Sequence, residues 1–299
     1  MIRPASQAVL CIHNPYLMAS HIDLHSHSTV SDGLLTPSAL VHHAVAQGVD
    51  VLALTDHDDV AGLDEAAQVA AEQGIEFIRG VEISVTWNRR TLHIVGLKIA
   101  KDCRPLMDGL AAIRQGRHVR AEAMAESLSR AGIADSLQGS YRFAGQGIIG
   151  RTHFARFLVE KGYAKDIRSV FKKYLVKGKP GYCEHRWADM ADAIDWINQS
   201  GGIAVLAHPG RYDLGRTNML KLLNEFREMG GRAIEVVTGS HSVDQYQHFA
   251  KLSHQFELMA SKGSDYHGTG HNYIEMGRLP DLPDLCTPVW HDWPEFRQE

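Results

Sequence analysis

From His21 onward, short apolar runs alternate with amphipathic segments, which is the pattern of β-strands connected by helices. Thr36 followed by Pro37 predicts a helix start, because Thr is a favoured N-cap and Pro fits the first helical position. The run over 49–55 is continuously apolar, as in a strand buried on both faces of a parallel sheet. We expect strands at 21–27, 49–55, 75–86 and 91–99, helices at 37–47 and 63–73, and a turn at 88–90.

The pattern changes after residue 100, because the stretch 106–182 has helical periodicity, is basic and contains no strong strand. Alternation then resumes, with helices expected at 188–199, 218–229 and 242–255 and strands at 203–207, 233–237 and 257–261. Six or seven parallel strands with flanking helices predict an α/β fold, a distorted (β/α) barrel with a helical insertion. The expected division is a leader at 1–20, a first barrel part at 21–103, the insertion at 104–184, and a second barrel part with a tail at 185–299.

Composition excludes several classes of protein. The chain has 44% apolar and 22% charged residues, unlike disordered, collagenous or coiled-coil sequences. A net charge of −4 excludes a broad basic coat but leaves room for a local cationic pocket. Four widely separated cysteines without a CxxC pair argue against thiolate zinc sites and favour the cytoplasm. No apolar run approaches the roughly 18–20 residues of a membrane span, and residues 1–20, which lack a signal-peptide cleavage site, are expected to be poorly ordered.

The unusual feature is the placement of the 18 histidines. His25 and His27 are two positions apart on an expected strand, so both side chains leave the same face, and Asp265 and His267 repeat this spacing. Further histidines and acids follow other strands, and the carboxyl ends of strands converge on one face of a βα barrel. The candidate metal ligands are His25, His27, Asp32, His57, Glu82, His93, His208, Asp265 and His267.

Imidazole and carboxylate ligands without thiolates suit Zn²⁺, Mn²⁺ or Fe²⁺, and do not suit a zinc finger or a Ca²⁺ site. Nine candidates are too many for one ion but enough for two or three ions that share carboxylates. Closely spaced ions activate water and clamp the oxygens of an in-line displacement, as in phosphoester hydrolysis. Two acids have simpler interpretations: Asp23 either orients an imidazole or is merely a buried acid, and Asp58, like Asp59, is expected to cap the next helix.

These residues carry a resemblance. The motifs His25-Ser26-His27, Thr55-Asp56-His57, Gly80-Val81-Glu82, His93, His208-Pro209 and Ser264-Asp265-Tyr266-His267 resemble the ordered motifs of the PHP (polymerase and histidinol phosphatase) family. The resemblance implies a distorted (β/α)7 PHP barrel with a trinuclear metal centre. Asp32-Gly33, the segment 151–156, the segment 178–182 and the segment 207–212 are most similar to the branch of 3′,5′-nucleoside bisphosphate phosphatases, which includes a bacterial 5′→3′ exoribonuclease.

Carried over residue by residue, the resemblance implies one metal held by His25, His27, Glu82 and Asp265, a second by Asp32, His57 and the shared Glu82, and a third by His93, His208 and His267. The implied cofactors are two to three divalent ions, manganese first, with zinc and iron as alternatives. The implied catalytic groups are a hydroxide held by the cluster, Asp265 and His208. Substrate contacts are expected from Arg151, His153, Lys179, Arg211 and His241.

Other motifs are weaker. The sequence 145–150 satisfies GxGxxG, but no apolar strand precedes it, so no dinucleotide cofactor is expected. A helix start beside Arg151 is a natural anion site. Tyr163, Tyr182 and Trp187 are either a stacking surface for a base or core residues.

The function that unites these features is metal-dependent phosphoester hydrolysis. The expected substrate is a nucleoside 3′,5′-bisphosphate that loses its 3′-phosphate, or a short 5′-phosphorylated RNA that releases 5′-mononucleotides, with no membrane partner. Another PHP phosphatase acting on histidinol phosphate is the alternative enzyme, and a non-catalytic metal- or nucleic-acid-binding domain is the alternative class. The resident metal, base preference, oligomeric state and protein partners stay open.

Overall fold

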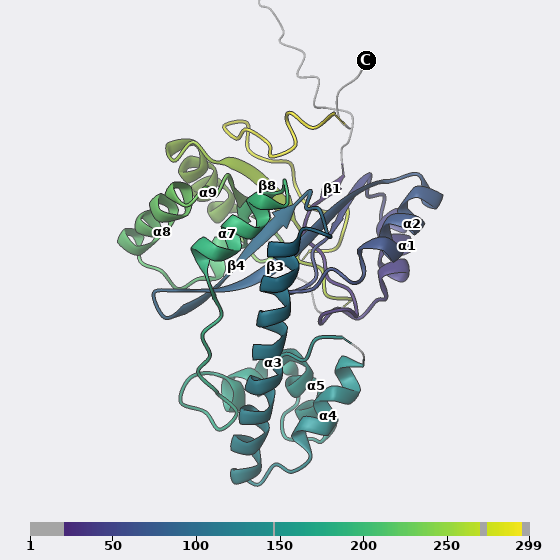
Figure 1. Cartoon of the computed structure of the whole chain (residues 1–299), viewed down its shortest axis with the longest axis vertical. Coiled ribbons are helices and arrows are strands. Elements are labelled where there is room, and N and C mark those ends of the chain that lie inside the picture. Colours follow the sequence, from purple (N-terminus) through teal and green to yellow (C-terminus); the bar gives the residue numbers. More distant parts are fainter. Residues whose placement is uncertain (1–20, 146, 270–273, 295–299) are drawn as a thin grey trace, which may run out of the picture.

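The chain folds into a strand-lined body and a helical arm that projects from one side of it (Figure 1). The computed structural model describes residues 21–145, 147–269 and 274–294, so the expected leader at 1–20 lies outside the described residues. No helix within these ranges is both long and apolar enough to cross a membrane.

Seven strands form the wall of a distorted barrel, in the order β1-β2-β3-β4-β6-β7-β8, with β5 paired to β3 outside this path. The amide of Leu24 donates to the carbonyl of Lys262 at 3.0 Å, and the amide of Asp265 donates to the carbonyl of His25 at 2.9 Å. These two hydrogen bonds join the first strand to the last. The predicted seven-stranded barrel is therefore confirmed. The strands are β1 Ile22–Asp23, β2 Val51–Leu54, β3 Glu76–Trp87, β4 Arg90–Leu97, β5 Ala188–Asp189, β6 Ile203–Leu206, β7 Ala233–Thr238 and β8 Met259–Gly263.

Of the expected six or seven parallel strands, six have a parallel neighbour, and β4 is the exception, since it runs antiparallel to both β3 and β6. The cause is the turn between β3 and β4. Asn88 and Arg89 adopt positive φ angles of 46° and 63°, as in the two-residue turns of β-hairpins. Parallel strands need a crossover of a dozen or more residues, and this turn supplies none.

Helices cover the outside of the barrel, with α1 and α2 on one side and α7, α8 and α9 on the other (Figure 1). The Thr36 hydroxyl accepts from the amide of Ala39 at 3.2 Å, as expected of an N-cap, and Gly74 ends α2 with a left-handed φ of 70°. The helices are α1 Pro37–Ala46, α2 Leu63–Gln73, α7 Met190–Gln199, α8 Arg216–Glu228 and α9 Val243–Gln255.

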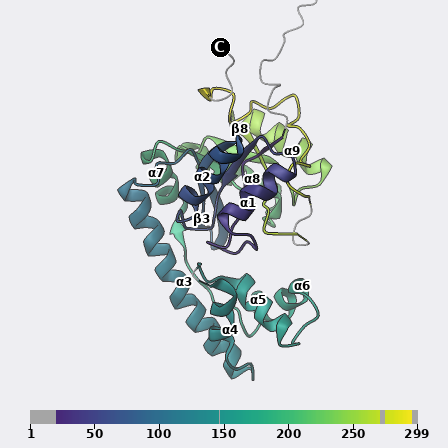
Figure 2. The same ribbon diagram turned by 90° about the vertical axis from the view of Figure 1, so that its right-hand side faces the viewer.

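The arm has an apolar core of its own, in which Leu128, Phe154 and Phe157 are buried. Its helix α3 is 27 residues long and runs from the barrel, where it contacts α7, to the far end of the arm (Figure 2). The arm consists of α3 Arg104–Arg130, α4 Ser136–Ala144, α5 Arg151–Glu160, α6 Ile167–Val170 and the π-helical turn η1 Phe171–Leu175. One rigid helix therefore sets the position of the arm relative to the barrel.

A buried ion pair joins α3 to the barrel. The Arg117 guanidinium donates through Nε to Asp58 Oδ2 at 2.8 Å and through Nη2 to the Ser84 hydroxyl at 2.9 Å. The other oxygen of Asp58 accepts from the Ser84 amide at 2.7 Å. The expectation that Asp58 caps the next helix is therefore wrong. Helix α2 has no side-chain cap, and the Asp58 carboxylate pairs with Arg117 of the arm instead. Asp59 accepts from the amides of Val60 and Ala61 in the turn before α2, so it does not cap that helix either.

Replacing Arg117 with Met should destabilise the protein by about 3–5 kcal/mol, because Asp58 would remain buried without its partner. The measurement is the free energy of unfolding in urea. The matched control is Arg130→Met, which removes an exposed pair with Glu126 and should cost no more than about 0.5 kcal/mol. A loss for Arg117→Met no larger than for the control would show that the buried pair does not anchor the arm.

Candidate metal centre

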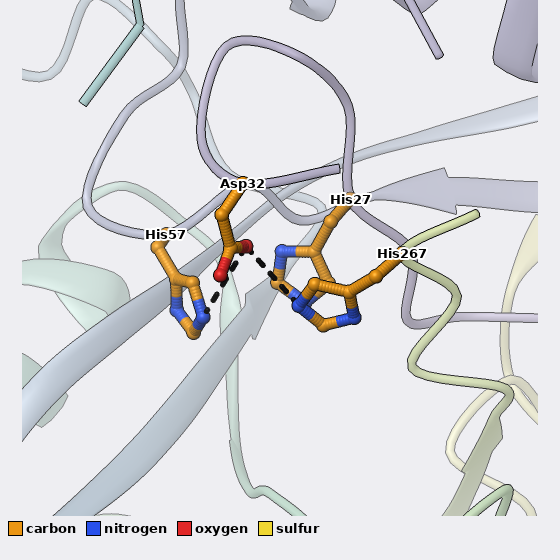
Figure 3. A group of neighbouring side chains, drawn as sticks. All are labelled: His27, Asp32, His57 and His267. Carbon is orange, nitrogen blue, oxygen red and sulfur yellow. Dashed lines mark ion pairs between the residues drawn. The ribbon is translucent and has the colours of Figure 1, made fainter. Parts of the chain in front are cut away.

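The nine candidate ligands lie at one end of the barrel. His25 and His27 follow β1, His57 follows β2, Glu82 and His93 lie on β3 and β4, His208 follows β6, and Asp265 and His267 follow β8. Asp32 reaches the group from the loop after β1, and Figure 3 shows it between His57 and His267. The predicted convergence of strand ends thus brings together imidazoles and carboxylates from across the barrel.

The Glu82 carboxylate is fully buried at the centre of this group. Its two oxygens face five imidazoles at once. The nitrogen-to-oxygen distances are 3.4 Å to His25, 3.3 Å to His27, 2.8 Å to His57, 2.8 Å to His93 and 2.9 Å to His208. A carboxylate whose two oxygens each face several imidazoles is suited to bridge metal ions that those imidazoles bind.

The ligand atoms fall into three overlapping sets, within each of which they lie within 4.8 Å of one another. The first set matches the first metal site that the resemblance implied. The sets are His25, His27, Glu82 and Asp265; then His27, Asp32, His57 and His267; and finally His57, Glu82 and His93.

The third implied site is not assembled as such, because His267 lies with Asp32 rather than with His93 and His208. His267 Nε2 is 3.1 Å from Asp32 Oδ1 (Figure 3). The backbone explains this position, since the amide of Leu34 donates to the carbonyl of His267 at 2.9 Å and ties it to the loop that carries Asp32. His93 and His208 instead meet at Glu82.

Unsatisfied polar atoms test whether these residues fit metal ions. Asp32 Oδ1, Glu82 Oε2 and His57 Nδ1 are buried and make no hydrogen bond of normal geometry among the described residues, and the groups that face them are other candidate ligands, at ion-pair distances. Buried polar atoms are normally satisfied by well-formed hydrogen bonds, so ligand atoms that only face one another suit a shared cation. With oxygen and nitrogen donors only, the residues fit divalent transition metals.

The charges of the group are strongly coupled. Burial alone would raise the pKa of Glu82, but the positive charges of His93 and His57 hold it well below its usual range. Burial lowers the pKa of His27 to about 3, and repulsion from His267 adds to this effect. Burial also acts to lower the pKa of His267, but the Asp32 and Asp265 carboxylates outweigh it and raise that pKa to about 9. Without metal, His267 is therefore protonated at neutral pH and paired with Asp32.

Glu235, on β7, is a buried acid that contacts the candidate ligands and that the sequence analysis missed. It is almost fully buried, and His25 donates through Nδ1 to its Oε1 at 2.7 Å while the amide of His208 donates to its Oε2 at 2.6 Å. A carboxylate behind a ligating imidazole fixes the ring and its tautomer. The available signal was a single acid inside the apolar run 233–237.

Asp23, for which two interpretations were open, is a buried acid rather than a partner of an imidazole ring. Its Oδ1 accepts from the amides of His25 at 3.3 Å and Ser264 at 2.8 Å, so it holds two backbone segments together. Burial raises its pKa to about 6.

The arm contributes arginines to a cavity of about 170 Å³ beside the ligands. Arg117 and Arg120 come from α3, Arg151 begins α5, and Arg211 follows His208. Burial, together with the charges of Arg151 and Arg117, lowers the pKa of Arg120 to about 9, and its Nε has no hydrogen bond within the described ranges of the chain. Arg117 and Arg120 were missed, although their spacing of three places them on one face of a helix. This cavity holds more positive charge than its own carboxylates neutralise.

The remaining candidates for substrate contact differ in position. Arg151 and Arg211 line the cavity, and Arg211 donates to Asp265 Oδ2 at 2.6 Å. His153 accepts from the amide of Gly150 at the start of α5, and His241 accepts from the amide of Gly210 while stacking on Phe249. Both of these histidines therefore hold loops in place. Lys179 is exposed and does not line the cavity.

The aromatic and glycine-rich motifs also have defined places. Trp187 is buried, with Arg117 4.8 Å and Arg120 5.2 Å from its ring, so it supports the arginines rather than offering a free face. In the GxGxxG segment, Gln146 lies outside the described residues, and the preceding element is α4 rather than a strand.

Comparisons with known proteins agree on one family. The PHP domain model matches residues 23–269. The chain is 50% identical, over 91% of its length and 96% of the relative, to a 3′,5′-nucleoside bisphosphate phosphatase of Chromobacterium violaceum. It is 46% identical, over 91% of its length and 93% of the relative, to the 5′-3′ exoribonuclease Rnm of Escherichia coli.

Two solved structures share the fold. One, from Chromobacterium violaceum, is described as an amidohydrolase with bound sulfate and no metal; it is 49% identical with a TM-score of 0.89 and covers 92% of this chain and 96% of that one. The other, from Bifidobacterium adolescentis, is described as a candidate metal-dependent phosphoesterase; it is 25% identical with a TM-score of 0.77 and covers 91% of this chain and 94% of that one.

Glu235→Gln should weaken metal binding by about 10- to 100-fold, because the amide cannot match the carboxylate that orients His25. Metal affinity is measured by competition with a chelator, and activity at saturating metal is measured in parallel. Glu228→Gln, an exposed change on α8, is the matched control and should alter neither. Unchanged metal affinity in Glu235→Gln would remove the orienting role.

Metal loading should release at least one proton per chain at pH 7.5, since His267 has to lose its proton before it can bind an ion. Metal affinity should consequently rise with pH through about pH 9 and level off above it, where His267 is mostly neutral. Calorimetry in two buffers of different ionisation enthalpy counts the released protons. His267→Gln should release about one proton fewer, and a pH-independent affinity would contradict the pairing of His267 with Asp32.

Proposed function

The chain belongs to the PHP domain family, and on this basis we propose that it is a metal-dependent phosphoesterase acting on nucleotides that carry a 5′-phosphate. Its substrates are nucleoside 3′,5′-bisphosphates, which lose the 3′-phosphate, and short 5′-phosphorylated RNA, which releases 5′-mononucleotides. Support comes from the names of two relatives, a bisphosphate phosphatase and a 5′-3′ exoribonuclease.

One observation carries the proposal: four of the candidate ligands (Asp32, His57, His93 and His267) and four arginines line the same cavity. A simple phosphate monoester places one phosphate at the metal centre and has no need of a second cationic site. A nucleotide with phosphates at both ends needs both sites, because one phosphate reacts while the other is held. The 5′-phosphate is then common to the bisphosphate and to RNA, so a single geometry serves both reactions.

Divalent ions held by the nine ligands would supply positive charge to the reacting phosphoryl group and acidify a water molecule. The chain's own residues bind and orient the substrate. Arg151 and Arg120 hold the 5′-phosphate in a partly desolvated site, where charge-assisted hydrogen bonds are strong. Arg211, paired with Asp265, lies beside the reacting phosphate and offsets charge that develops on its oxygens.

Asp265 is the proposed catalytic carboxylate. Burial acts to raise its pKa, but the charges of His25 and His267 hold that pKa well below its usual range, so the group is ionised and offers its oxygens to a metal ion and to the Arg211 guanidinium. His208 is the second proposed catalytic residue, and its Nε2 lies 2.9 Å from Glu82 Oε1.

The arm also contributes to the metal side of the site. Thr152 donates to Asp32 Oδ2 at 2.9 Å, and Arg156 donates to the Asp32 carbonyl at 2.6 Å. The helix that begins with the phosphate-binding Arg151 therefore also orients a metal ligand. We propose manganese as the resident metal and the cytoplasm as the location.

A two-by-two comparison of enzyme and substrate tests the role of Arg151. Removing the 5′-phosphate from a nucleoside 3′,5′-bisphosphate should lower kcat/KM by roughly 10- to 150-fold, the effect of losing about 1.5–3 kcal/mol of charge-assisted contact. Arg151→Ala should cause a similar loss with the bisphosphate and little further loss with the 3′-monophosphate.

Arg168→Ala, an exposed change elsewhere in the arm, serves as the control and should leave both substrates unaffected. Losses from the variant and from the truncated substrate that simply add would mean that Arg151 does not bind the 5′-phosphate.

A further inference from the structure

A second, larger cavity of about 350 Å³ lies beside the first. The two share Thr91, Arg120, Arg151 and Trp187, so the arginines assigned to the 5′-phosphate form the boundary between them. A cavity of this size falls within the range of small-ligand sites. Both phosphates of a nucleoside bisphosphate are assigned to the first cavity, and neither of them occupies the rest of this space.

The rim of the second cavity is cationic. Arg89 and Arg90, at the tip of the β3–β4 hairpin, are exposed and make no ion pair within the part of the chain that the structure describes. Arg186 also lines the cavity, but Asp189 pairs with it at 2.9 Å. Across the whole lining, five arginines (Arg89, Arg90, Arg120, Arg151 and Arg186) accompany two carboxylates, those of Glu184 and Asp189.

The wall of the cavity offers flat side chains for a base. Tyr182 and His185 are partly exposed there, and burial lowers the pKa of His185, which keeps its ring neutral. Aromatic faces beside a positive groove are the usual means of binding single-stranded nucleic acid without sequence preference.

At the hairpin tip, an arginine occupies a backbone position that is more favourable for glycine. Arg89 has a left-handed φ of 63° at the second position of the turn, where glycine is strongly favoured. Thr91, two residues before His93 and on the same face of β4, lines both cavities, so the second cavity continues from the metal centre along this strand. Arg90 begins the strand, about 10 Å from His93.

We propose that the second cavity binds the nucleotide on the 3′ side of the scissile phosphate, with Arg89 and Arg90 contacting the next phosphodiester of a ribonucleotide chain. The inference rests on the proposed phosphoesterase function and adds to it a site that only a polymer can fill. A bisphosphate ends at the reacting phosphate, whereas each further nucleotide brings one more negative charge to the rim.

The test is the double variant Arg89→Gly/Arg90→Ala, in which glycine fits the left-handed turn and preserves the hairpin. Its kcat/KM is compared with that of the wild type on adenosine 3′,5′-bisphosphate and on 5′-phosphorylated oligoadenylates of two to five nucleotides. With the bisphosphate, the variant should stay within about twofold of the wild type. With the trinucleotide and longer chains, it should lose at least about tenfold.

Salt dependence supplies a second readout. Loss of the contact to this one phosphodiester should make the slope of log kcat/KM against log salt shallower by about 0.7 for the longer chains, and should leave the slope for the bisphosphate unchanged. The charge-matched control is Arg104→Ala/Arg130→Ala, which removes two exposed arginines of α3 and should affect neither substrate.

Equal losses on the bisphosphate and the oligonucleotides would overturn the proposal, since the cavity would then hold the terminal nucleoside. No loss on the longer chains beyond that of the control would overturn it as well. If the metal-loaded wild type hydrolyses neither substrate, the proposed function fails. Binding of a 5′-phosphorylated oligonucleotide, followed by fluorescence anisotropy in wild type and variant, then decides the role of the cavity independently.

Discussion

The carboxylate of Glu82 is the group on which the rest of the site depends. A buried carboxylate without partners is strongly unfavourable, and this one lies at the centre of the barrel end with no exposed surface. Five imidazoles from four different strand ends face its two oxygens. The barrel is thus built around a charge that is tolerable only when cations, either protonated histidines or metal ions, surround it.

Two further carboxylates extend this arrangement outward. Glu235 connects the ring of His25 to the backbone at His208, so two strands on opposite sides of β7 hold their ligands through one side chain. Asp58 follows the ligand His57 directly in the sequence and pairs with Arg117 of the arm. One short loop therefore carries both the ligand His57 and Asp58, which binds α3. This fixes the position of the arm's arginines relative to the metal centre.

The barrel and the candidate metal ligands could be predicted from the sequence. The features that could not be predicted depend on contacts between distant segments. The ligands were readable because HxH and DxH spacing and strand-end positions are local features that the barrel geometry brings together. The turn at 88–90 was predicted, and because so short a connection joins only antiparallel strands, it also contained the direction of β4. Glu235, Arg117 and Arg120 act through contacts between distant segments. The placement of His267 beside Asp32 depends on a backbone hydrogen bond from Leu34 that no spacing encodes.

The central claim is that Glu82 is shared between metal ions, and the metal content of Glu82→Gln tests it most directly. The variant and the wild type are loaded with manganese under identical conditions, freed of excess metal, and subjected to elemental analysis with circular dichroism as a check on folding. The account predicts two to three equivalents per chain in the wild type and at most one in a folded variant, because a neutral amide cannot bridge two cations. At most one equivalent in the wild type, or an undiminished metal content in Glu82→Gln, would contradict it.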